Sequence, residues 1–311
     1  MYKSILFVSI VLLAVAASLS VNDDVLDDNL IREVNSNPHS SWKAGRNPRF
    51  EGVSIGQAMS MMGTRKSVGK TSIKEKASSS IPSSFDSRVQ WPNCIHPVLN
   101  QEQCGSCWAF STSEALSDRL CIASNGQINV TLSPQALVSC DTYGNEGCNG
   151  GVPQLAWEYC ELHGLPTYSC YPYTSGNGTD GDCIKDSCAD NSQYQLFKAK
   201  EFTMKTCDSV ECIQELIYAN GPIVGTMEVY QDFISYTSGV YVYNGTAPLL
   251  GGHAIKIVGW GTDSASGLDY WAVQNSWGPT WGLNGFFWIQ RGVDMCGIDH
   301  DASASQGNTK Q

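Results

Sequence analysis

The segment Q-E-Q-C-G-S-C-W-A-F (residues 101–110) places two cysteines three positions apart, immediately before a long stretch that lacks helix breakers. Apolar residues recur on a helical period after Cys107, and Asn125-Gly126 ends the pattern, so we expect a helix that begins at Cys107. The free N–H groups and partial positive charge at a helix N-terminus stabilise an anion. Because a thiol is nucleophilic as the thiolate, Cys107 is predicted to have a lowered pKa and to be reactive.

Two later motifs supply a base and a group that orients it. In G-G-H-A (residues 251–254) the glycines leave little bulk beside His253, so a substrate backbone can approach closely. In N-S-W-G (residues 275–278) the amide of Asn275 is expected to hold the far imidazole nitrogen, and Trp277 to shield that bond from water. A thiol, a base and an orienting group together indicate an activated nucleophile.

The first residues and the cysteine content predict entry into the secretory pathway. Residues 5–17 are apolar apart from Ser9, follow Lys3 and precede small residues. This pattern is typical of a cleaved signal peptide (residues 1–20), and the run is too short for a membrane anchor. All 13 cysteines lie between Cys94 and Cys296, and an odd count leaves at least one unpaired. Three sequons are candidate glycosylation sites: Asn129, Asn177 and Asn244.

The charge is unevenly distributed along the chain. The net charge of −11 argues against nucleic acid or an anionic membrane as partner. Residues 21–80 contain nine Lys+Arg and seven Asp+Glu, whereas residues 81–311 contain nine and 23. Composition changes at Ile81-Pro82, so we expect a basic leader (residues 21–80) that is attracted to an acidic mature body (residues 81–311).

The remaining patterns predict an α+β architecture with two unlike halves. A second amphipathic helix is expected at residues 209–219, ended by Asn220-Gly221-Pro222. Strands separated by glycine-rich turns are expected afterwards, at residues 223–229, 254–258, 270–274 and 286–290.

The three motifs taken together resemble the papain family of cysteine proteases, for which C-G-S-C-W is a known signature. Further segments resemble the cathepsin B branch of that family, among them I-P-S-S-F-D-S-R (residues 81–88), G-C-N-G-G-V-P (147–153) and, in the leader, W-K-A-G-R-N (42–47). The resemblance implies a papain-like two-domain fold, with a helical N-terminal half, an antiparallel β-barrel-like C-terminal half and the active-site cleft between them. It also implies a zymogen whose propeptide is inhibitory.

By the same resemblance Cys107 is the nucleophile, His253 the general base and then acid, and Asn275 the residue that orients His253. The side chain of Gln101 and the backbone N–H of Cys107 would bind the oxyanion. The residues expected to contact substrate are Gly105, Gly150, Gly151, Gly252, Ala254, Trp277 and Asp301.

The resemblance also implies disulfide pairing. The expected pairs are Cys94–Cys121, Cys104–Cys148, Cys140–Cys183 and Cys170–Cys188. Cys207–Cys212 is a plausible local bridge, which leaves Cys160 and Cys296 as buried thiols.

One departure from the cathepsin B pattern affects the predicted activity. Two adjacent histidines of an occluding loop give that branch dipeptidyl carboxypeptidase activity, but the corresponding region, Cys170 to Cys188, contains no histidine. We therefore expect an open cleft and endopeptidase action; the alternative is exopeptidase activity through another group. Asp301 is expected either to pair with an arginine at the P2 position of a substrate or to be a solvated carboxylate.

Other classes of function are weighed against the protease. C-x-x-C before a helix also describes a thioredoxin-like redox pair, but that interpretation gives His253 and Asn275 no role. The scattered cysteines do not have zinc-site spacing, and no cofactor is expected. A non-enzymatic homologue would typically have lost one of the four key residues. The expected partners of a monomeric enzyme are protein and peptide substrates, its own propeptide and cystatin-type inhibitors, in a lysosome-like acidic vesicle or outside the cell.

Overall fold

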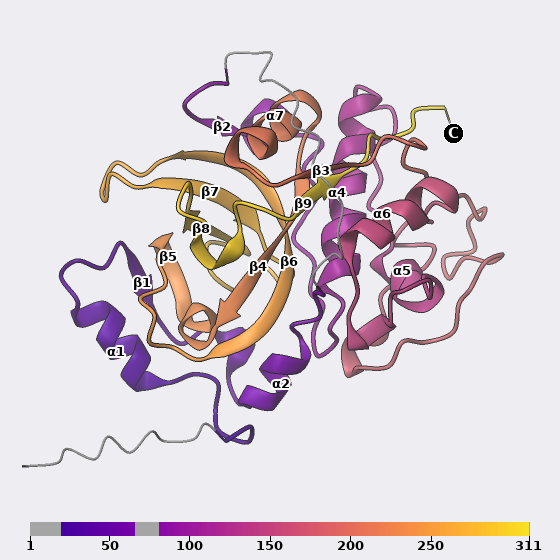
Figure 1. Cartoon of the computed structure of the whole chain (residues 1–311). Coiled ribbons are helices and arrows are strands. Elements are labelled where there is room, and N and C mark those ends of the chain that lie inside the picture. Colours follow the sequence, from indigo (N-terminus) through magenta and orange to yellow (C-terminus); the bar gives the residue numbers. More distant parts are fainter. Residues whose placement is uncertain (1–19, 66–80, 311) are drawn as a thin grey trace, which may run out of the picture.

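The computed structural model describes residues 20–65 and 81–310. Apart from Ser20, the predicted signal peptide lies outside the described residues, as does the last part of the leader with the expected cleavage site near residue 80. Two unlike halves stand side by side, and this confirms the predicted papain-like α+β architecture (Figure 1).

The helical half is built around α4 (Cys107–Ala123), whose start agrees with the prediction. This helix is buried from Cys107 to Cys121, because α5 (Pro134–Cys140) and α6 (Pro153–Leu162) pack against it on one side and the sheet packs against it on the other. A helix covered all round must be apolar or internally hydrogen-bonded on every face. Its serine and threonine hydroxyls accordingly donate to carbonyls of the preceding turn, as in Thr112 to Trp108.

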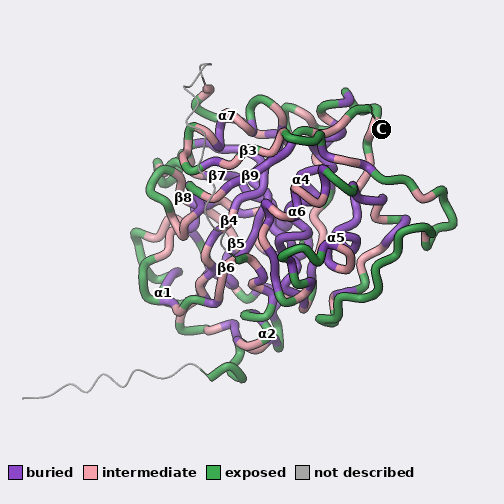
Figure 2. The backbone as a smooth tube through the Cα atoms, turned by 45° about the vertical axis from the view of Figure 1, so that its right-hand side comes forward, coloured by how far each residue is buried: buried purple, intermediate pink, exposed green. Residues whose placement is uncertain are grey.

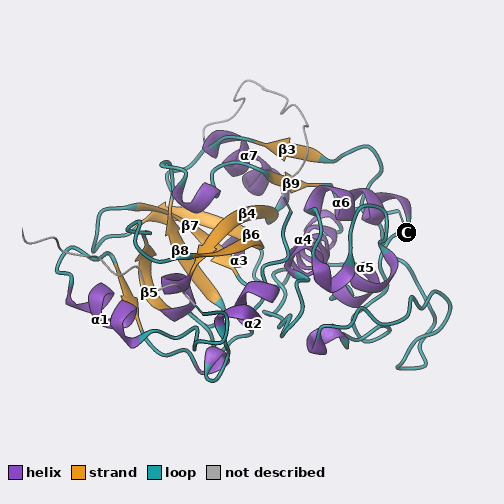
Figure 3. Ribbon diagram, turned by 60° about the horizontal axis from the view of Figure 1, so that its bottom comes forward, coloured by secondary structure: helices purple, strands orange, loops and turns teal. Residues whose placement is uncertain are grey.

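The other half is a twisted sheet, drawn in orange in Figure 3. Its strand order is β1 (Trp42–Ala44), β5 (Tyr236–Tyr241), β8 (Phe286–Gln290), β7 (Asp269–Gln274), β6 (Leu249–Thr262), β4 (Ile223–Tyr230), β9 (Ala302–Ala304) and β3 (Lys205–Cys207), with β2 (Phe85–Asp86) paired to β6. The pairings are antiparallel except that β5 and β8 run parallel, which corrects the expectation of a wholly antiparallel half. Two helices accompany the sheet, α7 (Val210–Asn220) and the short α3 (Ser87–Gln90).

The leader covers one edge of this sheet and continues to the boundary between the halves. Its helices are α1 (Asp28–Ser36) and α2 (Ile55–Ser60), the latter with a capping box formed by Ser54 and Gln57. Between them β1 adds a strand to β5. In Figures 1 and 3, α1 lies beside the sheet and α2 lies where the two halves meet.

Aromatic contacts fix the leader on the sheet. Trp42 is buried, with its ring 5.0 Å from that of Tyr241, and Phe50 lies edge-on to Trp277 at 5.1 Å. Burial of one large apolar side chain stabilises a contact by about 1.5–3 kcal/mol. Figure 2 shows that the buried backbone runs through the sheet and along α4.

Both ends of the described body cross between the halves. Near its start, Phe85 pairs with Trp260 of β6 in the sheet. Near its end, the chain leaves β9, and Gly307 pairs with Ala199, whose N–H donates to Cys160 of α6.

Five disulfides are present: Cys94–Cys121, Cys104–Cys148, Cys140–Cys183, Cys170–Cys188 and Cys207–Cys212. The free cysteines are Cys107, Cys160 and Cys296. Cys296 is only partly buried, which differs from the expectation of a buried thiol. Within the described residues, no helix has the length and apolarity needed to cross a bilayer.

Candidate active site

Cys107 is the first residue of α4, and its side chain is buried and unbonded to any other cysteine. Burial is the largest single influence and raises the pKa of the thiol, but the charge of His253 and several hydrogen bonds together outweigh it, so that the net effect is a lowered pKa. Hydrogen bonds from the Thr64 hydroxyl and the Ala254 backbone act in the same direction. This is the electrostatic environment of a reactive thiolate.

His253 and Asn275 lie behind this thiol, on β6 and directly after β7. Nε2 of His253 donates to Oδ1 of Asn275 at 2.8 Å, and both residues are fully buried. The Trp277 ring lies 4.9 Å from the imidazole and has no exposed surface, so this bond is kept from water. Nδ1 of His253 is buried without a hydrogen-bond partner among the described residues, and it is the ring nitrogen left for proton transfer.

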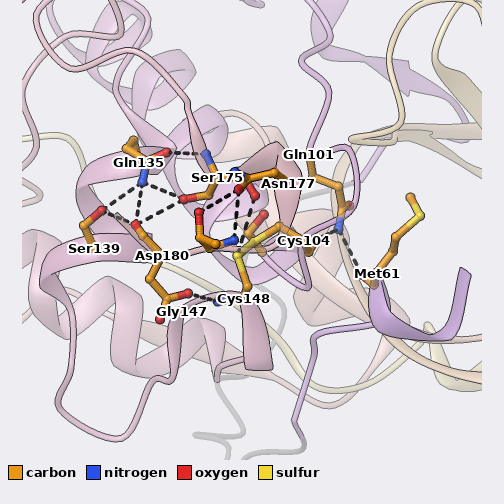
Figure 4. Close-up of a disulfide and its surroundings, with 12 residues drawn as sticks. Met61, Gln101, Cys104, Gln135, Ser139, Gly147, Cys148, Ser175, Asn177 and Asp180 are labelled. Carbon is orange, nitrogen blue, oxygen red and sulfur yellow. Dashed lines mark hydrogen bonds between the residues drawn. A yellow bond between two sulfur atoms is a disulfide. The ribbon is translucent and has the colours of Figure 1, made fainter. Parts of the chain in front are cut away.

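Gln101 is held rigidly at the other side of the thiol. Its Oε1 accepts from the Ser276 hydroxyl at 2.7 Å, which turns Nε2 toward the cleft. Nε2 donates to the carbonyls of Cys104 at 2.8 Å and of Met61, a leader residue, at 2.9 Å (Figure 4). A leader carbonyl thus occupies the donor that is expected to bind the oxyanion.

The leader runs through the cleft over residues 61–65, where Met61 ends α2 and Thr64 forms an isolated β-bridge with Gly151. The Thr64 hydroxyl lies 3.2 Å from the Cys107 sulfur. The backbone N–H of Thr64 donates to Gly252 on one wall, and Gly151 on the other wall donates to the carbonyl of Gly63 at 2.8 Å. This segment therefore contacts both walls of the cleft at once.

Glycine is required at several positions of the cleft because other atoms of the protein lie close to its backbone there. A Cβ on Gly63 would lie 1.7 Å from the carbonyl oxygen of Gly105, and one on Gly105 would lie 2.5 Å from that of Cys148. A Cβ on Gly151 would clash with the Trp108 ring at 2.6 Å, and Gly150 has a φ of 107°, which side chains disfavour. These positions have space only for backbone.

The Cys104–Cys148 disulfide ties the glycine-rich wall to the segment before Cys107. Figure 4 shows the neighbouring loop that braces it. The Asp180 carboxylate accepts from the N–H of Cys148 at 2.6 Å, and the Asp180 carbonyl accepts from the Gln135 amide at 2.8 Å. The loop between Cys170 and Cys188 is therefore fastened to the helical half.

Asp301 lies at a cavity of about 500 Å³ that opens beside Thr64 and Gly252. Its carboxylate accepts from the Gln154 amide at 2.8 Å and from the Thr226 hydroxyl at 3.3 Å. Both of these donors are neutral side chains.

Four residues in the site were not predicted from the sequence. The Met61 carbonyl accepts from the Gln101 amide, and the Thr64 hydroxyl contacts the Cys107 sulfur. Ser276 holds the Gln101 side chain, and the Tyr173 hydroxyl donates to the Gln101 backbone carbonyl at 2.8 Å. Ser276 is part of the N-S-W-G motif, so its position carried a signal. The others lie in segments without a recognisable pattern.

The fold and this site define a cysteine protease held as a zymogen by its own leader. The family model "Papain family cysteine protease" matches residues 81–306 and "Peptidase family C1 propeptide" matches residues 26–67, so the chain belongs to the papain family. Cathepsin B-like cysteine proteinase 5 of Caenorhabditis elegans is 43% identical over 267 residues, which covers 75% of this chain and 76% of that protein.

Other relatives point to the same branch. Cathepsin B-like protease 1 of Arabidopsis thaliana is 33% identical, and the match covers 92% of this chain and 85% of that protein. The solved structure of proCathepsin B S9 from Trypanosoma congolense superposes with a TM-score of 0.82 at 30% identity, covering 92% of this chain and all of that one.

Proposed function

We propose that the mature protein is an endopeptidase that hydrolyses peptide bonds through Cys107, His253, Asn275 and Gln101. One observation carries the proposal. Cys107 is a buried thiol whose pKa is lowered, with His253 among the causes, and it lies in a cleft that already holds a segment of peptide chain. The rival, a non-enzymatic binding protein, gives no reason for an unpaired thiol with that pKa.

Each residue then has a chemical task. The Cys107 thiolate attacks the scissile carbonyl, and the Gln101 amide and the backbone N–H of Cys107 stabilise the oxyanion. His253 protonates the leaving amine, which frees the first product and leaves a thioester on Cys107. His253 next takes a proton from water, whose attack on the thioester releases the acid, while Asn275 keeps the imidazole oriented.

Endopeptidase action is supported by the loop between Cys170 and Cys188. It contains no histidine that could hold a C-terminal carboxylate, and Asp180 fastens it to the helical half. A substrate chain can then extend through the cleft in both directions. Release of C-terminal dipeptides through another group is the alternative outcome.

The domain organisation is part of the proposal. We assign residues 1–20 to a signal peptide, residues 21–80 to an inhibitory propeptide and residues 81–311 to the mature enzyme. The enzyme would act in a lysosome-like acidic vesicle or outside the cell. Asp301 would receive an arginine at the P2 position, since its cavity adjoins Gly252 in the cleft.

The test combines an epoxide or vinyl-sulfone thiol trap with a peptide library. Processed wild-type protein should be labelled at Cys107, while Cys107→Ala and His253→Ala should lose labelling and hydrolysis. Gln101→Ala should still be labelled but turn over about 10²–10³-fold more slowly. Internal cuts support the open cleft; release of C-terminal dipeptides alone, or a Gln101→Ala variant with normal kinetics, contradicts the corresponding part of the proposal.

A further inference from the structure

Glu146 stands at the rim of the cleft on a loop that the fold holds in place. Its N–H donates to the carbonyl of Gly150 at 2.9 Å. The preceding Asn145 is buried, and its side chain donates to Asp141 at 2.6 Å and accepts from the N–H of Val152 at 2.7 Å. Glu146 itself is exposed, so an anchored backbone presents one carboxylate to solvent.

In the zymogen this carboxylate is occupied by an arginine of the leader. Nη1 and Nη2 of Arg65 donate to the two oxygens of Glu146 at 2.6 Å and 2.5 Å, and Nη2 also lies 3.2 Å from the carbonyl of Asn149. This is the two-pronged geometry by which a guanidinium recognises a carboxylate. The backbone N–H of Arg65 meanwhile donates to Gly151, so the side chain reaches Glu146 from a segment seated in the cleft.

Other leader cations are used differently. Arg46 pairs with Asp28 at 2.9 Å and Glu51 at 3.1 Å, both within the leader itself. Among the described residues, the pair between Arg65 and Glu146 is the ion pair that joins the leader to the body. Glu146 is thus engaged by an arginine whose backbone is seated in the cleft.

We propose that Glu146 determines specificity in the mature enzyme by receiving the guanidinium of a substrate arginine bound next to Gly151. The inference rests on the proposed function, because it assigns the bound chain to a substrate once the leader has left. The Cys104–Cys148 disulfide and the Asp180 carboxylate belong to the body, so they keep the receptor in place after processing. A pre-organised carboxylate needs little reordering when it binds.

The chemistry distinguishes arginine from other side chains. Glu146 and the Asn149 carbonyl together accept three N–H groups from one planar fork. Lysine offers a point charge without that fork, and citrulline has the shape of arginine without the charge. The preferred substrates are therefore peptides with an arginine at this subsite, above those with lysine and well above those with citrulline.

The test measures kcat/KM of the processed enzyme with fluorogenic peptides in which arginine or citrulline is placed in turn at each of three positions before the scissile bond. At one position, wild type should prefer arginine about three- to tenfold, as expected for an exposed but bidentate pair. Glu146→Gln should bring that ratio close to one without changing the rate for the citrulline peptide. Glu201→Gln removes an exposed carboxylate elsewhere in the chain and should leave the ratio unchanged.

Titration with the thiol trap normalises every variant to its active fraction. An unchanged arginine preference in Glu146→Gln would overturn the inference, even if that variant activated faster, because Glu146 would then serve the leader alone. Wild type that cleaves the citrulline peptides but shows no preference overturns the inference and leaves the protease assignment intact. Wild type that cleaves neither peptide and is not labelled overturns both.

Discussion

The leader contacts the body in two regions that differ in chemistry. In the sheet dock (residues 42–50), β1 extends the sheet and Trp42 and Phe50 are buried against aromatic rings. In the cleft thread (residues 61–65), Met61 is buried, and the other contacts are hydrogen bonds to backbone, to Gln101 and to the Cys107 sulfur, with one exposed ion pair. We therefore expect the leader to be retained mainly by apolar burial in the dock, and catalysis to be blocked by the thread.

The largest expected effect is in the dock. Trp42→Ala should weaken the leader's hold by about 3–5 kcal/mol, because an aromatic side chain is deleted from a buried site. In the unprocessed chain, the rate at which a thiol trap labels Cys107 should rise by roughly 10²–10⁴-fold, with the thermal unfolding temperature recorded alongside. Lys43→Ala, on the exposed face of the same strand, is the control. A less than threefold change for Trp42→Ala would contradict the division of roles.

The second largest effect concerns a buried carboxyl of the body, not the leader. Glu114, in the middle of α4, is buried, and burial raises its pKa to about 7 against an opposing effect of Lys256. Since this pKa is raised by folding, the associated stability is complete below the unfolded value and is lost as the pH rises from about 4.5 to about 7. Over this pH range the free energy of unfolding should fall by roughly 3 kcal/mol.

Glu114→Gln keeps an oxygen to accept the Leu99 N–H and removes the charge. Urea unfolding of the processed enzyme between pH 4.5 and 8 should therefore depend less on pH in Glu114→Gln than in wild type. Glu211→Gln, at an exposed position on α7, should retain the wild-type slope. Parallel curves for Glu114→Gln and wild type would show that this carboxyl does not titrate in the range.

A smaller effect is expected in the thread. Thr64→Val removes the hydroxyl that stabilises the Cys107 thiolate, so the pKa of Cys107 in the unprocessed chain should rise toward its ordinary value. The pH dependence of thiol-trap labelling measures it. Thr64→Ser retains the hydroxyl and should behave like wild type; if Ser and Val give the same profile, the hydrogen bond is not responsible.

The smallest effect concerns the ion pair of the thread. Arg65 lowers the pKa of Glu146, so the contribution of this pair is present above the ordinary carboxyl pKa and is lost as the pH falls through the lowered value. Arg65→Gln should therefore loosen the leader about two- to fivefold at pH 7 and by less at an acidic pH below the ordinary carboxyl pKa. Labelling of the unprocessed chain at both values tests this. An equal difference at both would show that the contribution of this ion pair does not depend on the titration of Glu146.

Local patterns in the sequence predict the elements on which the site is built. The unbroken run after Cys107 predicts α4, and strand-like segments separated by glycine-rich turns predict β4, β7 and β8. These signals are reliable because they depend on neighbours in the chain. The meeting of Cys107, His253 and Asn275 was inferred from a family resemblance, since spacing alone does not bring distant segments together.

The rest of the site depends on contacts that leave no local pattern. The thread around Thr64 is extended because both cleft walls bind its backbone, and nothing in its own residues favours that conformation. The parallel pairing of β5 with β8 joins segments about 50 residues apart. Gln154 reaches Asp301 across 147 positions of sequence.

The crossing of both chain ends has a consequence for maturation. Phe85 is stacked on Trp260, and Gly307 lies against the backbone of α4 beside Leu120, so each end fastens the half opposite to the one it adjoins in sequence. The two walls of the cleft are thereby connected by two terminal segments of the body, one at each end. A processing cut upstream of Phe85 leaves this contact with Trp260 intact. A cut a few residues later would separate Phe85 from the helical half, and the two walls of the cleft would lose one of the connections between them.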